Sequence, residues 1–209
     1  MEGNGFRTVI AGGGVAALEA ALTLDELLGD RAETILLAPE PDFVYRPLAV
    51  AEPFGLGTAA RIPLSQLAEE AGARVETGAL ERVAVEQKTA ITADRVELPY
   101  DALLLTLGAR PTQALAGALT YRGVRDTDAF GAILRELEAG QVESVAFAVP
   151  TAAGWPLPLY ELAVLTAWHA RRGGLDVRLA LVTHEERPLG LFGARASEAV
   201  RRADRKSVV

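Results

Sequence analysis

The chain has 209 residues, of which 50% are hydrophobic and 23% charged, a composition typical of a soluble globular protein with one large domain or two small ones. A net charge of −7 does not favour nucleic acid as a partner, and the absence of cysteine excludes disulfides, thiolate metal sites, cysteine-bound iron–sulfur clusters and thiol redox chemistry within this chain. No apolar segment is long enough for a transmembrane helix and the N-terminus lacks the pattern of a signal peptide, so we expect a cytoplasmic protein.

The first predicted elements are a short apolar strand over residues 6–11 and an Ala- and Leu-rich helix over 16–28. The pattern G-x-G-x-x-G/A is matched by Gly12, Gly13, Gly14, Val15, Ala16 and Ala17. In this pattern Gly12 allows the tight turn, Gly14 lets a pyrophosphate approach the backbone, and Ala17 lets the helix pack close to the strand. The first helical turn would add free N–H groups and the positive end of the helix dipole. The pattern predicts a dinucleotide-binding turn, with a purely structural turn as the alternative.

A second predicted strand covers residues 34–37. In a dinucleotide-binding unit this strand is followed by an acid that binds the ribose hydroxyls, about 20 residues after the glycines. Here Pro39 and then Glu40 follow the strand, and Glu40 is our candidate. Glu33 precedes the strand and therefore lies at the wrong end. The alternative is that Glu40 is a solvated loop acid.

After Glu40 the chain departs from the regular strand–helix alternation of an NAD-dependent dehydrogenase, a further and less favoured hypothesis. A connection rich in proline and glycine, residues 39–57, leads to a short helix over 64–71. Short β-like stretches follow at 74–76, 80–86, 90–92 and 96–98, with hairpin turns at 87–89 and 93–95. The stretches predict an antiparallel meander inserted into an α/β unit, before a buried parallel strand over 102–107.

The second half predicts another strand–helix–strand unit. Its elements are a helix over 127–138, a strand over 144–149, a helix over 159–172 ending at Gly173-Gly174, a strand over 176–183 and a helix over 195–202. Its nucleotide signature is poor, because Gly154 is the only glycine in the loop and Pro156 and Pro158 lack the N–H donors that phosphates use. Glu185 or Glu186 is either a ribose ligand or part of a solvated turn. The two histidines, without clustered carboxylates, make no metal site.

Four parts of the sequence together resemble the FAD-dependent pyridine nucleotide-disulfide oxidoreductase superfamily. They are the turn from Gly12 to Ala17, the segment APEPDFVYRPLAV, the meander and the segment LPYDALLLTLGARP. Within this superfamily, the segments FVYRPL and WPLPLYELA are most similar in sequence to the branch of type II NADH dehydrogenases and sulfide:quinone oxidoreductases. The resemblance implies an α/β, Rossmann-like FAD/NAD(P)-binding fold with an inserted antiparallel β-meander at about 72–100, followed by a partial second Rossmann-like unit. It implies an FAD-binding domain over 1–115 and a partial NAD(P)-binding-like domain over 116–209.

The resemblance also implies particular cofactor contacts. It places the pyrophosphate of FAD against the residues from Gly12 to Ala16, the adenosine ribose near Pro39 and Glu40, and the phosphates or the flavin near Arg46. The backbone of Leu80 would meet the adenine edge, and Thr106 and Gly108 would close that side of the site. Two alternatives stay open, namely that Arg46 stacks on the surface and that Leu80 is a core residue.

By resemblance, the function is electron transfer through FAD from NAD(P)H or a small reductant to a quinone-type acceptor, in a homo-oligomer. The chain departs from the family in two places. Sulfide-oxidising relatives carry a redox cysteine in the loop that here reads GWPLP, so we do not expect sulfide oxidation. Family chains are also longer and return to the first domain, so we expect a truncated form with weak or no turnover. The alternative is a non-catalytic adenine-dinucleotide-binding or regulatory module that keeps the fold.

Overall fold

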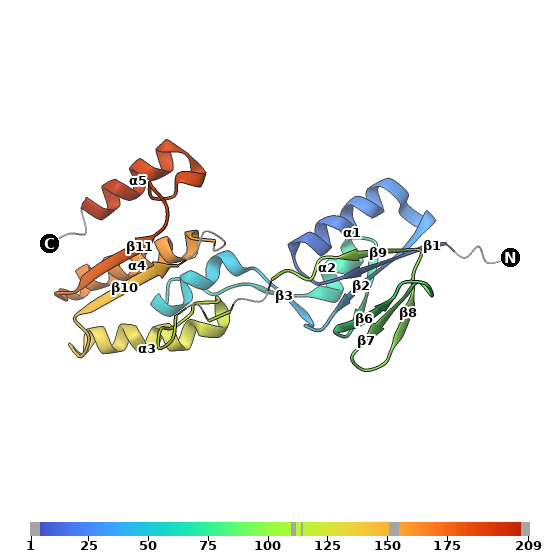
Figure 1. Ribbon diagram of the computed structural model, residues 1–209, viewed down its shortest axis with the longest axis horizontal. Helices are drawn as coiled ribbons and strands as arrows, with labels where there is room; N and C mark the ends of the chain where they lie inside the picture. Colours follow the sequence, from blue (N-terminus) through green and yellow to red (C-terminus); the bar gives the residue numbers. More distant parts are fainter. Residues whose placement is uncertain (1–4, 110–111, 114, 151–154, 206–209) are drawn as a thin grey trace. The chain divides into compact units, whose positions relative to one another are not determined.

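The computed structural model describes residues 5–109, 112–113, 115–150 and 155–205 (Figure 1). The chain divides into two compact units. The first comprises residues 1–44 and 60–110, and the second comprises residues 45–59 and 111–209. The segment between residues 44 and 60 therefore leaves the first unit, joins the second and returns.

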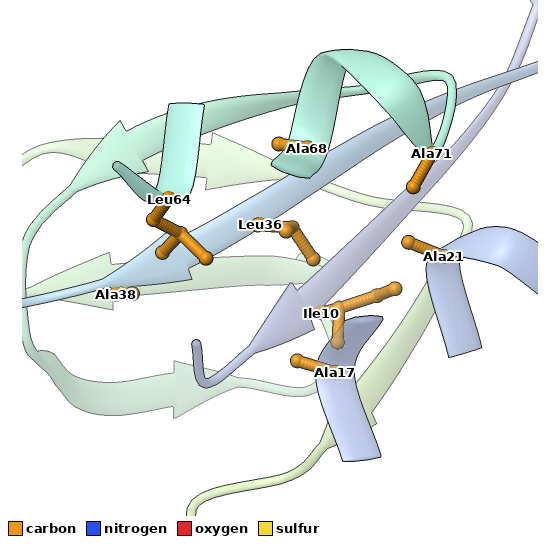
Figure 2. Close-up of a cluster of buried hydrophobic side chains, with 8 residues drawn as sticks. All are labelled: Ile10, Ala17, Ala21, Leu36, Ala38, Leu64, Ala68 and Ala71. Carbon is orange, nitrogen blue, oxygen red and sulfur yellow. The ribbon is translucent and has the colours of Figure 1, made fainter. Parts of the chain in front are cut away.

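A parallel sheet forms the centre of the first unit. Its strand order is β5 (Ala73–Thr77), β2 (Ala32–Ala38), β1 (Phe6–Ala11) and β9 (Ala102–Leu105). Helices α1 (Val15–Leu28) and α2 (Leu64–Glu70) cover one face, where Ile10 and Leu36 of the strands are fully buried. Figure 2 shows this cluster, in which the helices contribute Leu64 and the small side chains of Ala17, Ala21 and Ala68, with Ala71 from the end of α2 and Ala38 from β2. Small residues let the helices approach the sheet closely, as the sequence predicted for Ala17.

The other face of the sheet is covered by the predicted meander, β6 (Leu80–Ala84), β7 (Thr89–Thr92) and β8 (Glu97–Pro99). Side chains alternate along a strand, so Val9, Ile35 and Leu37 point to this face, where they pack against residues of the meander. Both predicted hairpin turns are confirmed, each containing one residue with positive φ, Lys88 or Arg95.

One strand was assigned wrongly. The stretch 74–76 was expected in the meander, but it forms β5 and pairs in parallel with β2. The reason is that β5 follows α2 and completes a strand–helix–strand crossover, which brings Val75 against the buried cluster under α1 and α2.

An antiparallel ribbon leads from the first unit into residues 45–59. It pairs β3 (Asp42–Val44) with β4 (Arg61–Pro63). Between these strands lie two short 3-10 helices, η2 (Arg46–Val50) and η3 (Glu52–Phe54), both in the second unit. A third 3-10 helix, η1 (Gly29–Arg31), follows α1.

The second unit is built on a parallel pair, β10 (Ser144–Val149) and β11 (Arg178–Thr183). The helices are α3 (Thr127–Glu138), α4 (Leu157–Gly173) and α5 (Ala194–Arg205), with the 3-10 turns η4 (Val124–Asp126) and η5 (Gly190–Phe192). The predicted bounds of α3 and β10 are confirmed, and α4 ends as expected in a left-handed glycine, Gly174. The core contains Val50, Phe130, Leu134, Leu137, Phe147 and Leu162. Within the described residues, no helix combines the length and apolar character needed to cross a bilayer.

Candidate functional site

The carboxyl edge of the parallel sheet gathers segments that lie far apart in the sequence. The chain leaves β1 through α1 to β2 on one side, whereas β9 pairs on the other side of β1. Strand order therefore changes direction at β1, and in open α/β sheets ligands bind at such a switch point, outside the carboxyl ends of the strands. Gly12, Pro39 and Thr106 are each the first residue after one of these three strands.

Gly12 is required by the fold itself. Its φ is +138°, a region that residues with a side chain rarely adopt. A Cβ at this position would overlap the backbone oxygen of Thr106. Thr106 is held there because its N–H and its Oγ1 both donate to the carbonyl of Ala11, at 2.9 and 3.0 Å. The Gly12 N–H donates to the Leu37 carbonyl at 2.8 Å, which fixes the turn between β1 and β2.

Gly13 and Gly14 differ in their surroundings. A Cβ at Gly13 would lie 2.8 Å from Cδ2 of Leu64 and 2.9 Å from Cβ of Ala38, so packing requires glycine there. Gly14 is exposed, with φ −92° and ψ −172°, and no atom lies within 4 Å of a Cβ built on it. The apoprotein fold therefore gives no steric or conformational reason for glycine at position 14.

Gly14 is also the N-cap of α1. The Ala17 N–H donates to the Gly14 carbonyl at 3.0 Å. The N–H groups of Val15 and Ala16 stand at the first two helical positions, which have no acceptor within a helix. The first turn of α1 holds no acidic residue and Val15 is 62% exposed. A free helix N-terminus beside an uncovered backbone fits an anionic group such as a diphosphate.

The other predicted cofactor residues have different settings. Pro39 and Glu40 are exposed directly after β2, and Gly108, exposed with φ +67°, lies shortly after β9. The Leu80 side chain packs against the cluster under the meander, so any role at the adenine falls to its backbone. Arg46 is exposed at the start of η2 in the second unit. The cofactor contacts of these residues stay predictions.

Glu33 has a structural role at the opposite edge of the sheet. Its carboxylate accepts a hydrogen bond from Nε of Arg7 at 2.6 Å and one from Nε of Arg74 at 3.2 Å, which joins β1, β2 and β5. The hydrogen bond from Arg7 is the largest cause of a lowered pKa for this carboxyl group. Glu33 is the second residue of β2 rather than preceding it, and it lies at the end of that strand opposite Pro39 and Glu40, as the sequence predicted.

The second unit presents a different helix start after its first strand. Pro156 is the N-cap of α4 and Pro158 occupies the second helical position, so neither offers an N–H. The N–H groups of Leu159 and Tyr160 both donate to the Pro156 carbonyl, at 3.0 and 3.3 Å. Within the described part of this turn, Leu157 alone keeps a donor at a position without a helical acceptor. Gly154 lies outside the described residues.

The carboxyl end of β11 holds an interaction that the sequence did not reveal. The Tyr160 hydroxyl, buried on α4, donates to Oε2 of Glu185 at 2.8 Å, and Oγ1 of Thr183 donates to the same oxygen at 3.2 Å. Burial is the largest cause of a raised pKa at Tyr160, followed by the hydrogen bond with Glu185. Helical periodicity placed Tyr160 in α4, but only the fold brings it to Glu185.

Among the described residues, no group of histidines and carboxylates could hold a metal ion. No protein-family model matches the chain, and no curated protein matches its sequence.

Several solved structures are similar in fold. The sulfide:quinone oxidoreductase from the hyperthermophilic bacterium Aquifex aeolicus superposes with a TM-score of 0.83 at 20% sequence identity, over 97% of this chain. NDH2 from Plasmodium falciparum, solved in complex with NADH, gives a TM-score of 0.73 at 16% identity over 97% of the chain. Putidaredoxin reductase, from its covalent complex with putidaredoxin, gives 0.65 at 18% identity over 97% of the chain.

The chain shares the fold of these proteins. It spans 49%, 46% and 48% of their respective lengths, so about half of each neighbour has no counterpart in it. The expected α/β fold with an inserted antiparallel meander is confirmed.

Proposed function

We propose that the chain is the dinucleotide-binding part of an FAD-dependent oxidoreductase, and that the glycine turn holds the diphosphate of FAD. The observation that carries the proposal is Gly14, where the fold alone gives no reason for glycine and the space beside the backbone is open. A diphosphate resting on this backbone, against the N–H groups of Val15 and Ala16, supplies the reason.

The other contacts are assigned from the carboxyl ends of β1, β2 and β9 and, for Leu80 and Arg46, from the resemblance alone. Gly12, Gly13 and Ala17 shape the turn, because each is tightly packed in it. We assign the adenosine ribose to Pro39 and Glu40, the adenine to the backbone of Leu80, and closure of the site to Thr106 and Gly108. Arg46 is assigned to the phosphates or the flavin.

When bound, FAD would supply the redox chemistry, by taking electrons from a donor and passing them to an acceptor. The residues of the chain bind and orient it. The resemblance to type II NADH dehydrogenases, and two neighbours that are a sulfide:quinone oxidoreductase and a protein solved with NADH, support NAD(P)H or a small reductant as donor and a quinone-type acceptor. Because the chain spans about half the length of these neighbours, we expect weak or no turnover from it alone.

We also infer a cytoplasmic homo-oligomer. Self-association is supported by β9, which lies at an edge of the sheet formed by the described residues and has exposed leucines at and just beyond its end. Leu105 is 60% exposed and Leu107 is 62% exposed. An open strand edge with exposed apolar side chains favours pairing with another chain.

A second candidate function is a non-catalytic adenine-dinucleotide-binding or regulatory module. The start of α4 favours it, because Pro156 and Pro158 leave few donors for the phosphates of a nicotinamide dinucleotide. A chain that binds FAD or ADP in its first unit and no NAD(P)H in its second could not pass electrons between them.

One set of measurements tests both candidates. The purified protein is titrated with ADP and FAD by calorimetry, and its visible spectrum is recorded before and after NADH is added without oxygen. Bound flavin that NADH reduces supports the oxidoreductase. Binding of ADP or FAD without reduction supports the module, and no heat with either ligand contradicts both.

A further inference from the structure

Residues 45–59, which we call the strap, form part of the core of the second unit. The strap begins after β3 and ends before β4. Its buried residues are Ala49, Val50 and Ala59, which are 1%, 8% and 2% exposed. Val50 belongs to the main buried cluster of the second unit. The sheet of that unit has two strands among the described residues, and the strap adds Val50 and the partly buried Phe54 to its apolar packing.

Polar contacts fix the strap in place. Oε1 of Glu52 accepts a hydrogen bond from the Ala59 N–H at 2.6 Å, and Oε2 accepts one from Oγ1 of Thr127 at 2.9 Å. One carboxylate therefore joins the far end of the strap to the first residue of α3. In addition, the Tyr121 hydroxyl donates to the Ala49 carbonyl at 2.7 Å. Burial raises the pKa of Tyr121 to about 12, with smaller contributions from the charges of Glu52 and Asp126.

Phe54 is the aromatic anchor of the strap. Its ring centroid lies 5.9 Å from that of Phe130 on α3 and 6.0 Å from that of His169 on α4. Tilted and edge-on arrangements at these distances are favourable for aromatic pairs. Phe54 thus contacts both helices, and its removal would loosen each of them.

The two ends of the strap continue into β3 and β4 of the first unit, which pack near residues that contact the glycine turn. The Leu64 N–H, at the start of α2, donates to the Pro41 carbonyl at 2.8 Å, just before β3. Phe43 of β3 packs against the buried cluster that contains Leu64. The Leu64 side chain is also what a Cβ at Gly13 would meet, at 2.8 Å. A continuous set of contacts therefore leads from the glycine turn to the ribbon from which the strap departs.

We propose that the strap links the stability of the second unit to occupation of the glycine turn in the first. A ligand on the turn restrains Gly13 and Leu64, and through them the β3–β4 ribbon that fixes both ends of the strap. A strap whose ends are restrained loses less conformational entropy when it packs against α3 and α4. Ligand binding to the first unit therefore stabilises the second, and the effect is reciprocal. This inference rests on the proposed function, because it requires that the turn binds a nucleotide.

The chain offers a selective probe. It has two tryptophans, Trp155 and Trp168, and both belong to the second unit. Thermal unfolding followed by tryptophan fluorescence therefore reports on that unit. The full chain is unfolded with and without saturating ADP, and ADP binding is measured separately by calorimetry. We expect ADP to raise the tryptophan-monitored midpoint by about 2–5 °C.

Two variants separate linkage from simple ligand contact. Gly-Ser-Gly inserted after Val44 and again after Ala59 keeps the contacts of the strap but removes its fixed ends. This variant should still bind ADP, with at most a several-fold loss of affinity, and should show no ADP-induced shift of the midpoint.

Phe54→Ala should lower the midpoint by about 5–15 °C without ADP. Leu56→Ala is the matched control, because Leu56 lies in the strap and is 50% exposed, and it should leave the midpoint nearly unchanged.

The outcomes are distinguishable. An ADP-induced shift that the spacers abolish supports the linkage. ADP binding in the calorimeter with an unchanged midpoint overturns the linkage and leaves the proposed function intact. No ADP binding overturns both. A Phe54→Ala protein with the wild-type midpoint overturns the role of the strap whatever ADP does.

Discussion

The two helix starts that follow β1 and β10 occupy corresponding places in two strand–helix–strand units, yet their chemistry differs. At α1 the turn contains Gly12, Gly13 and Gly14, and the first helical positions keep their N–H groups. At α4 the N-cap and the second helical position are prolines. The same topology therefore presents several backbone donors in one unit and few in the other. Topology fixes where a phosphate could bind, and residue type decides whether it does.

The largest effect should come from Gly12. Gly12→Ala places a Cβ against the Thr106 backbone at a positive φ, and we expect a loss of about 3 kcal/mol or more in the free energy of unfolding. Urea unfolding followed by circular dichroism measures it. Gly14→Ala is the matched control, two residues away in open space with ordinary angles, and should cost less than about 1 kcal/mol. Equal losses at the two positions would contradict our division of the turn into structural and ligand-dependent glycines.

Gly14→Asp should separate binding from folding. Aspartate is a favourable N-cap residue, so the stability of the apoprotein should stay equal or rise by about 0.5–1 kcal/mol. The carboxylate would occupy the space assigned to the diphosphate and repel it. We expect the affinity for ADP and FAD to fall by at least about 30-fold, or about 2 kcal/mol.

The charge effect at position 14 has its own control. Gly14→Asn has a similar side chain and also caps a helix, but it carries no charge. Calorimetry with ADP should rank the affinities as wild type, then Asn, then Asp. If the turn is purely structural, the three proteins should not differ in their affinity for ADP. Unchanged ADP binding by the Gly14→Asp protein would rule out the diphosphate site.

At the second helix start, Tyr160→Phe removes the hydroxyl that donates to Glu185. We expect the second unit to lose about 1 kcal/mol, measured by tryptophan-monitored unfolding. The raised pKa of Tyr160 gives a pH signature, because a proton held more tightly in the folded state stabilises the fold below the ordinary tyrosine value of 10.0. That stability is lost as the pH rises through the raised pKa. As the pH rises above 10.0, the free energy of unfolding should therefore fall less in the Tyr160→Phe protein than in the wild type. Tyr121, with a pKa of about 12, remains in the variant, so the part of the pH dependence that it causes should persist.

Much of this arrangement follows from local patterns. Apolar runs predicted β1 and β10, apolar residues at helical spacing predicted α3, and the spacing of small residues predicted the glycine turn. These patterns are local because backbone conformation and helix packing restrict residue types locally. The sequence could not assign residues 74–76 to the parallel sheet, since a short strand has the same pattern in either sheet. Nor could it place Phe54 under α3 and α4 or pair Tyr160 with Glu185, because these contacts depend on tertiary packing between distant segments.

The smallest effect should come from giving a donor back to α4. Pro158→Ala restores an N–H at the second helical position, so any affinity of the second unit for NADH should rise by about threefold at most. NADH also carries an ADP group, which could occupy the glycine turn, so the comparison is made in the Gly14→Asp background. Quenching of tryptophan fluorescence by NADH measures it. Pro47→Ala, which changes an exposed proline at the start of η2, should have no effect. Tight NADH binding by the Gly14→Asp protein that still carries Pro158 would contradict this prediction. It would show that the prolines do not prevent nucleotide binding at the start of α4, and that the N–H of Leu157 suffices.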